Sequence, residues 1–421
     1  MTAAVALAGR RPITQSELDL MVDAHERFMS GKPGGKRASM RFVDMSGLDL
    51  SGRNLADADL SASIFEGTKM VGTRLERANL FGCDLRKADL RQAVLERADL
   101  RGACLKGANL AGANLKQADF REGQISMPHP SKGLDSLRHE RRNGQIDQAI
   151  LTGAMLDGAQ LAGASAYATD FTDCSLRGAN LTGANLKDAN LSGAMLEGAE
   201  VGGANMENAN FDGAILTGVE MSRARTSGAK MTGSLCEPSA AAVAKGPSLL
   251  AMAKGNNDWC VTGGKSGAPA NFDGQDLRPV GDTLRGLHLT VMTAKGACMV
   301  GMDLTGAQLQ GANLEGADLR GAVLKDCDLR GAKLIGANLN KADLRGAQFS
   351  ALPLGPGRST PASLAGARMR YALAQSADFS SANLDAADLR WADFTGAVMK
   401  GATLRQADIS AVIGLDLGVE F

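Results

Sequence analysis

The sequence predicts a solenoid in which the chain bends once in every five residues, and two observations carry this prediction. One five-residue unit recurs over most of the chain: Ala, then Asp or Asn, then Leu or Phe, then two mostly polar or glycine positions. It is clearest between Arg97 and Glu122. The chain also has 421 residues, too many for one compact core, whereas each coil of a solenoid contacts only its neighbours.

A five-residue period excludes both regular elements. On an α-helix of about 3.6 residues per turn, residues five apart point about 140° apart, so the leucines would scatter around the axis. On a flat strand, successive leucines would alternate between the two faces. A bend every five residues turns each leucine toward one interior axis. Glycines such as Gly102, Gly107 and Gly112 suit the corners.

The units Ala98-Asp99-Leu100, Ala108-Asn109-Leu110 and Ala113-Asn114-Leu115 resemble those of the pentapeptide-repeat proteins. This resemblance implies an all-β solenoid, a right-handed quadrilateral β-helix with four pentapeptides per coil. The central Leu, Phe or Met and the preceding small residue would point inward. The resemblance covers most of the chain, but it indicates fold far more than function, because one fold hosts unrelated functions.

Residues 1–39 are expected to form a tail and a capping helix. A capping box of Thr14 and Glu17 starts a helix that runs to Gly31. Such a helix would cover the open end of the first coil. We interpret His25 as a packed side chain rather than a ligand. The apolar stripe at helical spacing comprises Leu18, Met21, Val22, His25, Phe28 and Met29.

The first block of repeats spans residues 40–125, with a central residue at every fifth position from Met40 to Ile125. Residues 126–148 then interrupt it, and the repeat resumes at Leu151 with its phase moved by one residue, which indicates a true insertion. We expect an inserted loop there. Loops carried by rigid scaffolds often hold function, so its basic run is a candidate partner-binding site, and a solvated tether is the alternative. The candidate residues are Arg138, His139, Arg141 and Arg142.

A second, mildly acidic block spans residues 149–235, and residues 236–283 are predicted to hold a linker, a second capping helix and an irregular entry. The linker would cover 236–246, and the helix would follow Pro247. Three positions repeat at a constant offset, which indicates an internal duplication. Gly31, Gly35 and Ala38 recur as Gly263, Gly267 and Ala270.

The third block spans residues 284–410 and carries an irregular insertion at 350–363 across which the phase is preserved. The apolar tail at 411–421 is expected to cover the last coil or to pair with a second copy of the chain. The pattern leaves open whether the blocks stack coaxially or lie side by side.

No constellation for chemistry is found. The aspartates recur once per unit rather than as an acid–base pair, and the glycines follow the repeat rather than a phosphate loop. The seven cysteines form no C-x-x-C pair. We therefore expect no enzyme, cofactor or metal site, and a reducing, cytoplasmic setting. No apolar run approaches the roughly 20 residues that span a bilayer.

The function expected is a non-catalytic scaffold or adaptor for protein partners, with homodimerisation through the C-terminal tail or the coil ends as a further possibility. The 46 basic and 46 acidic residues balance, so bulk charge gives no reason to expect nucleic-acid binding. The resemblance supplies the alternative, a DNA mimic that protects a type II topoisomerase. Those relatives are strongly acidic, whereas arginines directly follow central leucines here, as in Arg86, Arg91 and Arg101.

Overall fold

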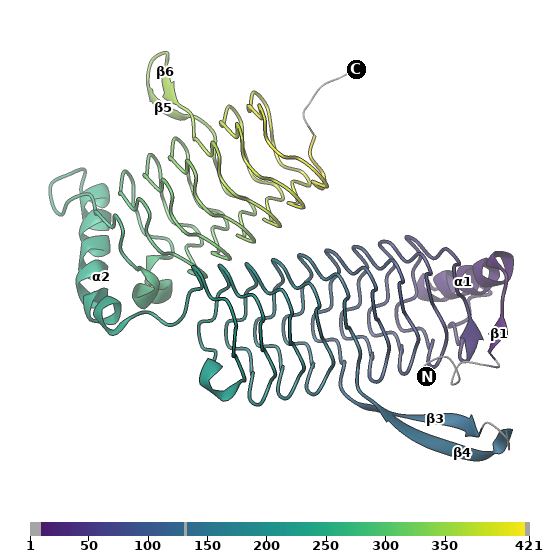
Figure 1. Cartoon of the computed structure of the whole chain (residues 1–421). Coiled ribbons are helices and arrows are strands. Elements are labelled where there is room, and N and C mark those ends of the chain that lie inside the picture. The colour runs from purple at the N-terminus through teal and green to yellow at the C-terminus, as the bar shows by residue number, and fades with distance from the viewer. Residues whose placement is uncertain (1–9, 130–132, 417–421) are drawn as a thin grey trace. The chain divides into compact units, whose positions relative to one another are not determined.

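The computed structural model describes residues 10–129 and 133–416, and the chain divides into two compact units, Met1–Glu237 and Pro238–Phe421. Each unit is a right-handed quadrilateral β-helix, as the sequence predicts (Figure 1). Parallel bridges join positions 20 residues apart, so that Asn79 pairs with Asp99 and Asp99 with Asp119. Four pentapeptides therefore complete one coil.

Backbone hydrogen bonds and apolar burial explain why this sequence coils. The N–H of Leu100 donates to the carbonyl of Asp119 in the next coil at 2.8 Å, and Asp99 donates back to Ala78 at 3.0 Å. The corner residue Gly102 has a φ of +64°, which glycine adopts without strain. Leu100 is fully buried. Burying one such side chain contributes about 1.5–3 kcal/mol.

The inner small position holds alanine in most units. Polar residues at this position donate a hydrogen bond to a backbone carbonyl in the same way each time. Thr68 Oγ1 donates to the carbonyl of Met45 at 2.8 Å, and Cys83 Sγ donates to that of Leu60 at 3.1 Å. Each acceptor lies 23 residues earlier in the chain. The inner position thus accepts a hydroxyl or thiol without leaving a buried donor unpaired.

The insertion in unit 1 is a β-hairpin rather than an irregular loop. Strands β3 (Gly123–His129) and β4 (Gly133–Arg142) pair in antiparallel fashion. Across the insertion, Cys104 bridges to Gln145, 41 positions on instead of 20. The 21 additional residues exceed a multiple of five by one, which explains the shift in phase.

Two predicted boundaries around this hairpin are wrong. Ile125 is not the last central residue of the first block, because it lies in β3 and the last buried centre is Phe120. The repeat resumes at Ile146, which is fully buried, and not at Leu151. Ile146 escapes the sequence pattern because Gly144 replaces the alanine that normally precedes a centre.

Unit 2 carries a smaller hairpin of β5 (Leu352–Gly355) and β6 (Arg358–Thr360). Lys333 bridges to Ser363, 30 positions on, so the hairpin adds ten residues, or two whole repeats. That count explains why the phase is preserved. The described residues also include the 3-10 turns η2 (Met221–Arg223) in unit 1 and η3 (Arg278–Leu284) in unit 2.

Helix α1 (Gln15–Met29) covers the first coil of unit 1 (Figure 1). The predicted capping box is present, with Thr14 and Glu17 each accepting from the other's backbone N–H. Just before it, β1 (Arg11–Pro12) pairs in parallel with β2 (Val43–Asp44). The chain therefore contributes to the coil before the helix begins.

Helix α2 (Ala240–Val261) stands at the start of unit 2, and it begins earlier than predicted. Ser239 caps it, and Pro247 lies inside it, so the predicted linker at 236–246 is largely helical. The prediction placed the helix after Pro247 because proline lacks a backbone donor and disfavours a helix interior. Met252 of this helix is 37% exposed.

The two helices bury the same stripe. Of the stripe predicted for α1, Met21 and Phe28 are exposed. The residues that are buried recur in α2 at a constant offset of 231 positions, which supports the internal duplication. They are Leu18, Val22 and His25 in α1, and Leu249, Ala253 and Asn256 in α2.

His25 joins α1 to the coil through both ring nitrogens. Its Nδ1 accepts the Ala38 N–H at 3.0 Å, and its Nε2 lies 2.9 Å from the Ala56 carbonyl, to which it donates. The side chain is fully buried. His25 is thus a packed and fully paired residue, as predicted.

Asn256 makes the matching contacts at the start of unit 2. Its Oδ1 accepts the Ala270 N–H at 2.7 Å, and its Nδ2 donates to the Thr290 carbonyl at 3.3 Å. Imidazole and amide therefore perform the same task, because each accepts one backbone N–H and donates to the coil backbone, with Asn256 Nδ2 also 3.4 Å from the His288 carbonyl oxygen.

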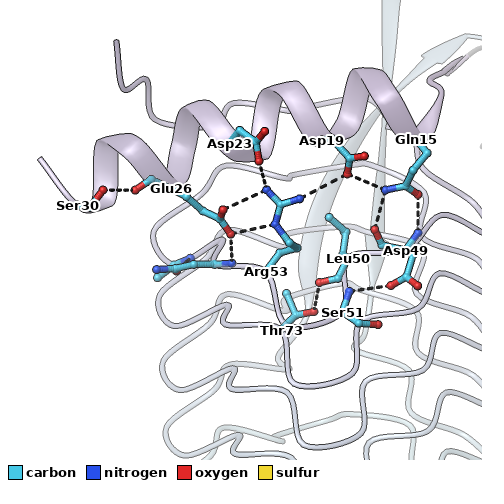
Figure 2. Close-up of polar contacts among 12 residues, drawn as sticks. Gln15, Asp19, Asp23, Glu26, Ser30, Asp49, Leu50, Ser51, Arg53 and Thr73 are labelled. Atoms are coloured by element: carbon cyan, nitrogen blue, oxygen red, sulfur yellow. Dashed lines mark hydrogen bonds and ion pairs between the residues drawn. The ribbon is translucent and has the colours of Figure 1, made fainter. Parts of the chain in front are cut away.

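The polar surroundings of the two caps differ. Figure 2 shows Arg53 of the first coil facing three carboxylates of α1. It bonds to Asp23, and its guanidinium lies 3.4 Å from Asp19 Oδ1 and 3.1 Å from Glu26 Oε1. At the equivalent place in unit 2, partly buried Leu250 and Leu287 pack against the core instead.

Candidate interaction surfaces

Glycines hold the base of the β3–β4 hairpin close to the coils. A Cβ on Gly144 would lie 2.2 Å from the Phe120 carbonyl oxygen, and one on Gly123 would lie 2.8 Å from the Phe81 ring. The Arg101 guanidinium stands 5.6 Å from the centre of that ring. These close approaches fix where the hairpin leaves the coil stack.

The four predicted partner-binding residues all lie on β4, where Arg138 pairs in register with Met127 and His139 with Ser126. The side chains of Arg138 and His139 lie outside the part of the structure that is described. Arg141 is 81% exposed, and its Nε lies 3.5 Å from Glu122. Successive strand positions belong to opposite faces, so Arg138 and Arg142 occupy one face of the hairpin and His139 and Arg141 the other.

The arginines that follow central leucines are paired with the aspartates that precede them. In one such clamp, Arg101 N donates to Asp99 Oδ1 at 3.1 Å, its Nε donates to the same oxygen, and its Nη2 donates to Oδ2 at 2.7 Å. The same bidentate clamp recurs in both units. The other aspartates are Asp84, Asp89, Asp119, Asp276, Asp318, Asp328, Asp343 and Asp388, each with the arginine two positions on.

Such clamps keep the aspartates ionised. A hydrogen bond from Arg91 is the main cause that lowers the pKa of Asp89. At Asp388, burial acts to raise the pKa, but hydrogen bonds from Arg390 and Arg370 outweigh it and lower the pKa to about 2. The coil faces therefore present paired charges at neutral pH rather than a field of one sign.

One corner of unit 2 carries a set of side chains that the sequence reasoning missed, Lys341, Tyr371 and Trp391, which we call the aromatic ladder. They occupy the same corner of three successive coils, between Gly321 and Ala411. The rings of Tyr371 and Trp391 are 6.3 Å apart and 10° from parallel, and Lys341 Nζ lies 6.0 Å from the Tyr371 ring centre. Tyr371 and Trp391 are 20 residues apart in the sequence, which is one full coil, and this spacing could have predicted that their rings stack.

In the part of the chain that the structure describes, chemically reactive groups do not gather at one place. Burial raises the pKa of the thiols of Cys83 and Cys327 to about 12, so they stay protonated at neutral pH. Among the described residues, no three His, Cys, Asp or Glu side chains are placed to hold a metal ion. His288 is exposed, and its backbone N–H donates to Asn257 Oδ1 at 3.1 Å.

Coils of four pentapeptides, an inner ladder of leucines and alanines, and capping helices define a β-helical repeat protein. The sequence model described as pentapeptide repeats matches eight segments that together cover more than half of the chain, so the chain belongs to the pentapeptide-repeat family. The matched segments are 38–77, 78–117, 167–200, 196–233, 293–326, 322–351, 362–401 and 375–410.

Solved structures with this fold include Rfr23 from the cyanobacterium Cyanothece 51142, 30% identical over 31% of this chain and 90% of that chain, with a TM-score of 0.23. HetL, involved in heterocyst differentiation regulation in Nostoc sp. Strain PCC 7120, is 19% identical over 92% of this chain and 93% of its own, with a TM-score of 0.15. QnrB1, a plasmid-mediated fluoroquinolone resistance protein, is 17% identical over 49% and 95%, with a TM-score of 0.28. No curated protein matches the chain.

Across residues 10–129 and 133–416, no helix has the length and apolar character needed to cross a membrane. The longest helix, α2, has 22 residues and includes several polar ones.

Proposed function

We propose that this protein is a non-catalytic scaffold or adaptor that presents rigid β-helical faces and projecting hairpins to protein partners. The observation that carries the proposal is that both hairpins are additions to coils that close without them. Bridges continue from Cys104 to Gln145 and from Lys333 to Ser363 below the two insertions. Segments that the fold does not need, held at fixed places on a rigid support, are suited to recognition.

Surface charge weighs against the alternative, a DNA mimic that protects a type II topoisomerase. A mimic needs a continuous anionic surface, whereas the clamps pair aspartates with arginines along the coils of both units. The block at 149–235 has nine acidic and five basic residues, a modest excess. The scaffold proposal therefore has the stronger support.

A reducing, cytoplasmic setting is part of this proposal, supported by core thiols such as those of Cys83 and Cys327, which are buried and protonated at neutral pH. Homodimerisation through the last coil is a further part. Ile409 and Ile413 are each 45% exposed there, and Val412 and Leu415 pack against the core, while residues 417–421 of the predicted tail lie outside the described part. Light scattering of the purified chain tests it, and a monomeric mass at high concentration would exclude it.

Affinity capture from extract of the source cells tests the scaffold proposal. The full chain is compared with a variant lacking residues 122–142, which removes 21 residues and joins Arg121 to Asn143 in repeat register. A variant lacking 352–361 is the matched control, because it removes the other hairpin in register. The proposal expects a protein that the full chain and the control retain and the first variant loses. No capture by any bait would contradict the proposal, and identical capture by all three would contradict the part of it that assigns recognition to the β3–β4 hairpin.

A further inference from the structure

The aromatic ladder occupies positions where large side chains are costly. Lys341, Tyr371 and Trp391 have φ values of +58°, +57° and +62°, in the left-handed region where a side chain crowds the backbone. The fold does not require them, because Gly321 and Ala411 adopt φ values of +60° and +57° at the same corner one coil away on either side. Other corners also hold large residues at this φ, such as Arg77, Lys87 and Gln117, so what distinguishes the ladder is the stacking of its two rings rather than its backbone.

The ladder also brings together residue types that are rare in this chain. The chain has two tyrosines and two tryptophans, and one of each stacks here on adjacent coils. Chance placement along the two β-helices explains this poorly. Both rings are partly buried against the corner. They therefore form a fixed aromatic surface, which we call the ledge, rather than freely moving side chains.

Arginines flank the ledge on the same face. Arg370 and Arg390 both bond to Asp388, and Arg390 Nε also lies 3.2 Å from Asp408 Oδ2, which fixes their orientation. Arg368 is exposed, and it makes no ion pair with any residue in the described ranges. This face has three arginines, Arg368, Arg370 and Arg390, and two aspartates, which gives a net positive charge next to the rings, while the ammonium of Lys341 is buried.

We propose that the aromatic ladder with Arg368 is a docking site for an acidic peptide segment of a protein partner, one that also carries an apolar side chain. Trp, Tyr and Arg are the residue types that most often dominate binding energy at protein interfaces. Arg368 would pair with a carboxylate of the peptide, and the open face of Trp391, next to Ala411, would receive its apolar side chain. The inference rests on the proposed scaffold function and names the chemistry of one partner.

The two carboxylates on this face favour a peptide over single-stranded nucleic acid. Stacking on aromatic rings beside arginines would suit bases, but Asp388 and Asp408 would then lie beside the phosphates. A peptide can place a backbone N–H or a neutral side chain against them instead. Binding of oligonucleotide is therefore an outcome that the test must distinguish.

The test uses the full chain carrying W259F, which leaves Trp391 as the sole tryptophan and its fluorescence as the reporter. The probes are a panel of short synthetic peptides rich in Glu and Asp with one Leu or Phe, the same peptides with Lys in place of the acids, and oligo-dT. The inference expects some acidic peptides to change Trp391 emission, the lysine versions to have no effect, and oligo-dT to bind more weakly.

Variants then locate the site. R368E and W391A are each expected to weaken peptide binding about tenfold or more. Binding by W391A is followed by calorimetry. Y167A, which removes a surface tyrosine of unit 1, leaves peptide binding unchanged. Alanine already occupies this corner at Ala411, so W391A is expected to fold. Failure of every acidic peptide, tighter binding of oligo-dT, or equal binding by R368E would overturn the inference. If partner capture through the β3–β4 hairpin persists in that case, the scaffold proposal stands, so the two failures are distinguishable.

Discussion

Single residues decide how the caps meet the coils, and His25 makes one cap sensitive to pH. Desolvation is the main cause that lowers the pKa of His25 below its ordinary value of 6.5. Its Nδ1 accepts the Ala38 N–H, so protonation of Nδ1 would break that hydrogen bond and place two N–H donors against each other. The unfolded chain therefore binds more protons than the folded chain as pH falls below 6.5.

We expect the thermal stability of unit 1 to be fully present above pH 6.5, the ordinary pKa of histidine, and to decline as pH falls below it toward the lowered pKa of folded His25. Each pKa unit by which folding lowers the pKa of His25 corresponds to about 1.4 kcal/mol in the free energy of unfolding. H25N, which places the residue type of Asn256 in this cap, should flatten the decline even if it lowers stability overall. Melting followed by circular dichroism measures both. The lowered pKa values of Glu26 and Asp57 act below about pH 4.5, outside this window. An equal slope in H25N would contradict the assignment.

The polar cluster on α1 provides a second prediction at the scale of the residue. Removing Arg53 in R53A leaves three half-exposed carboxylates of like charge together, and we expect a loss of about 1 kcal/mol in the free energy of unfolding. The pair D19L and R53L copies Leu250 and Leu287 of unit 2 and should recover most of that loss. Urea denaturation of the three chains measures it. A double variant no more stable than R53A would show that the two caps are not interchangeable.

At the scale of the element, the number of inserted residues matters more than their sequence. Deleting residues 122–142 restores a continuous repeat, with Gly144 in the inner position and Ile146 as the next centre. We expect this variant to melt within a few degrees of the full chain. Deleting only 122–141 shifts every later centre in unit 1 by one position and turns its leucines out of the core.

The shorter deletion is therefore expected to lose most of unit 1 downstream of Phe120, although it removes one residue fewer. Hydrogen exchange of the coils containing Leu151 to Leu216 distinguishes the two variants. Equal protection in both would mean that the coils do not depend on the five-residue register. The account of the phase shift would then fail.

Periodic elements could be predicted from the sequence, and elements that depend on long-range contacts could not. The leucine and alanine ladder and the capping box of Thr14 are local signals, and both are confirmed. The start of α2 was missed because the helix contains Pro247 in its interior, a position that proline normally disfavours. The aromatic ladder was missed because the ten-residue hairpin between Lys341 and Tyr371 hides their common corner.

At the scale of the whole molecule, the chain consists of two modules of one design, a cap followed by coils. Each has its own continuous core, one running from Ile13 to Leu216 and the other from Leu249 to Met399. We therefore expect the fragments 1–237 and 238–421 to fold separately, each with a cooperative transition. Their summed circular dichroism should match that of the full chain. Failure of either fragment to fold would show that a unit needs the other.

Protein binding by projecting features of rigid coils is the central claim, and site-specific photocrosslinking in the source cells tests it most directly. A photoreactive residue is placed at Gln124 on the β3–β4 hairpin, at Arg368 beside the aromatic ladder, and at exposed Thr182 on a plain coil face as the control. The account predicts a discrete protein adduct from Gln124 or Arg368 and none from Thr182. No adduct at any position, or the same adducts from Thr182, would contradict it.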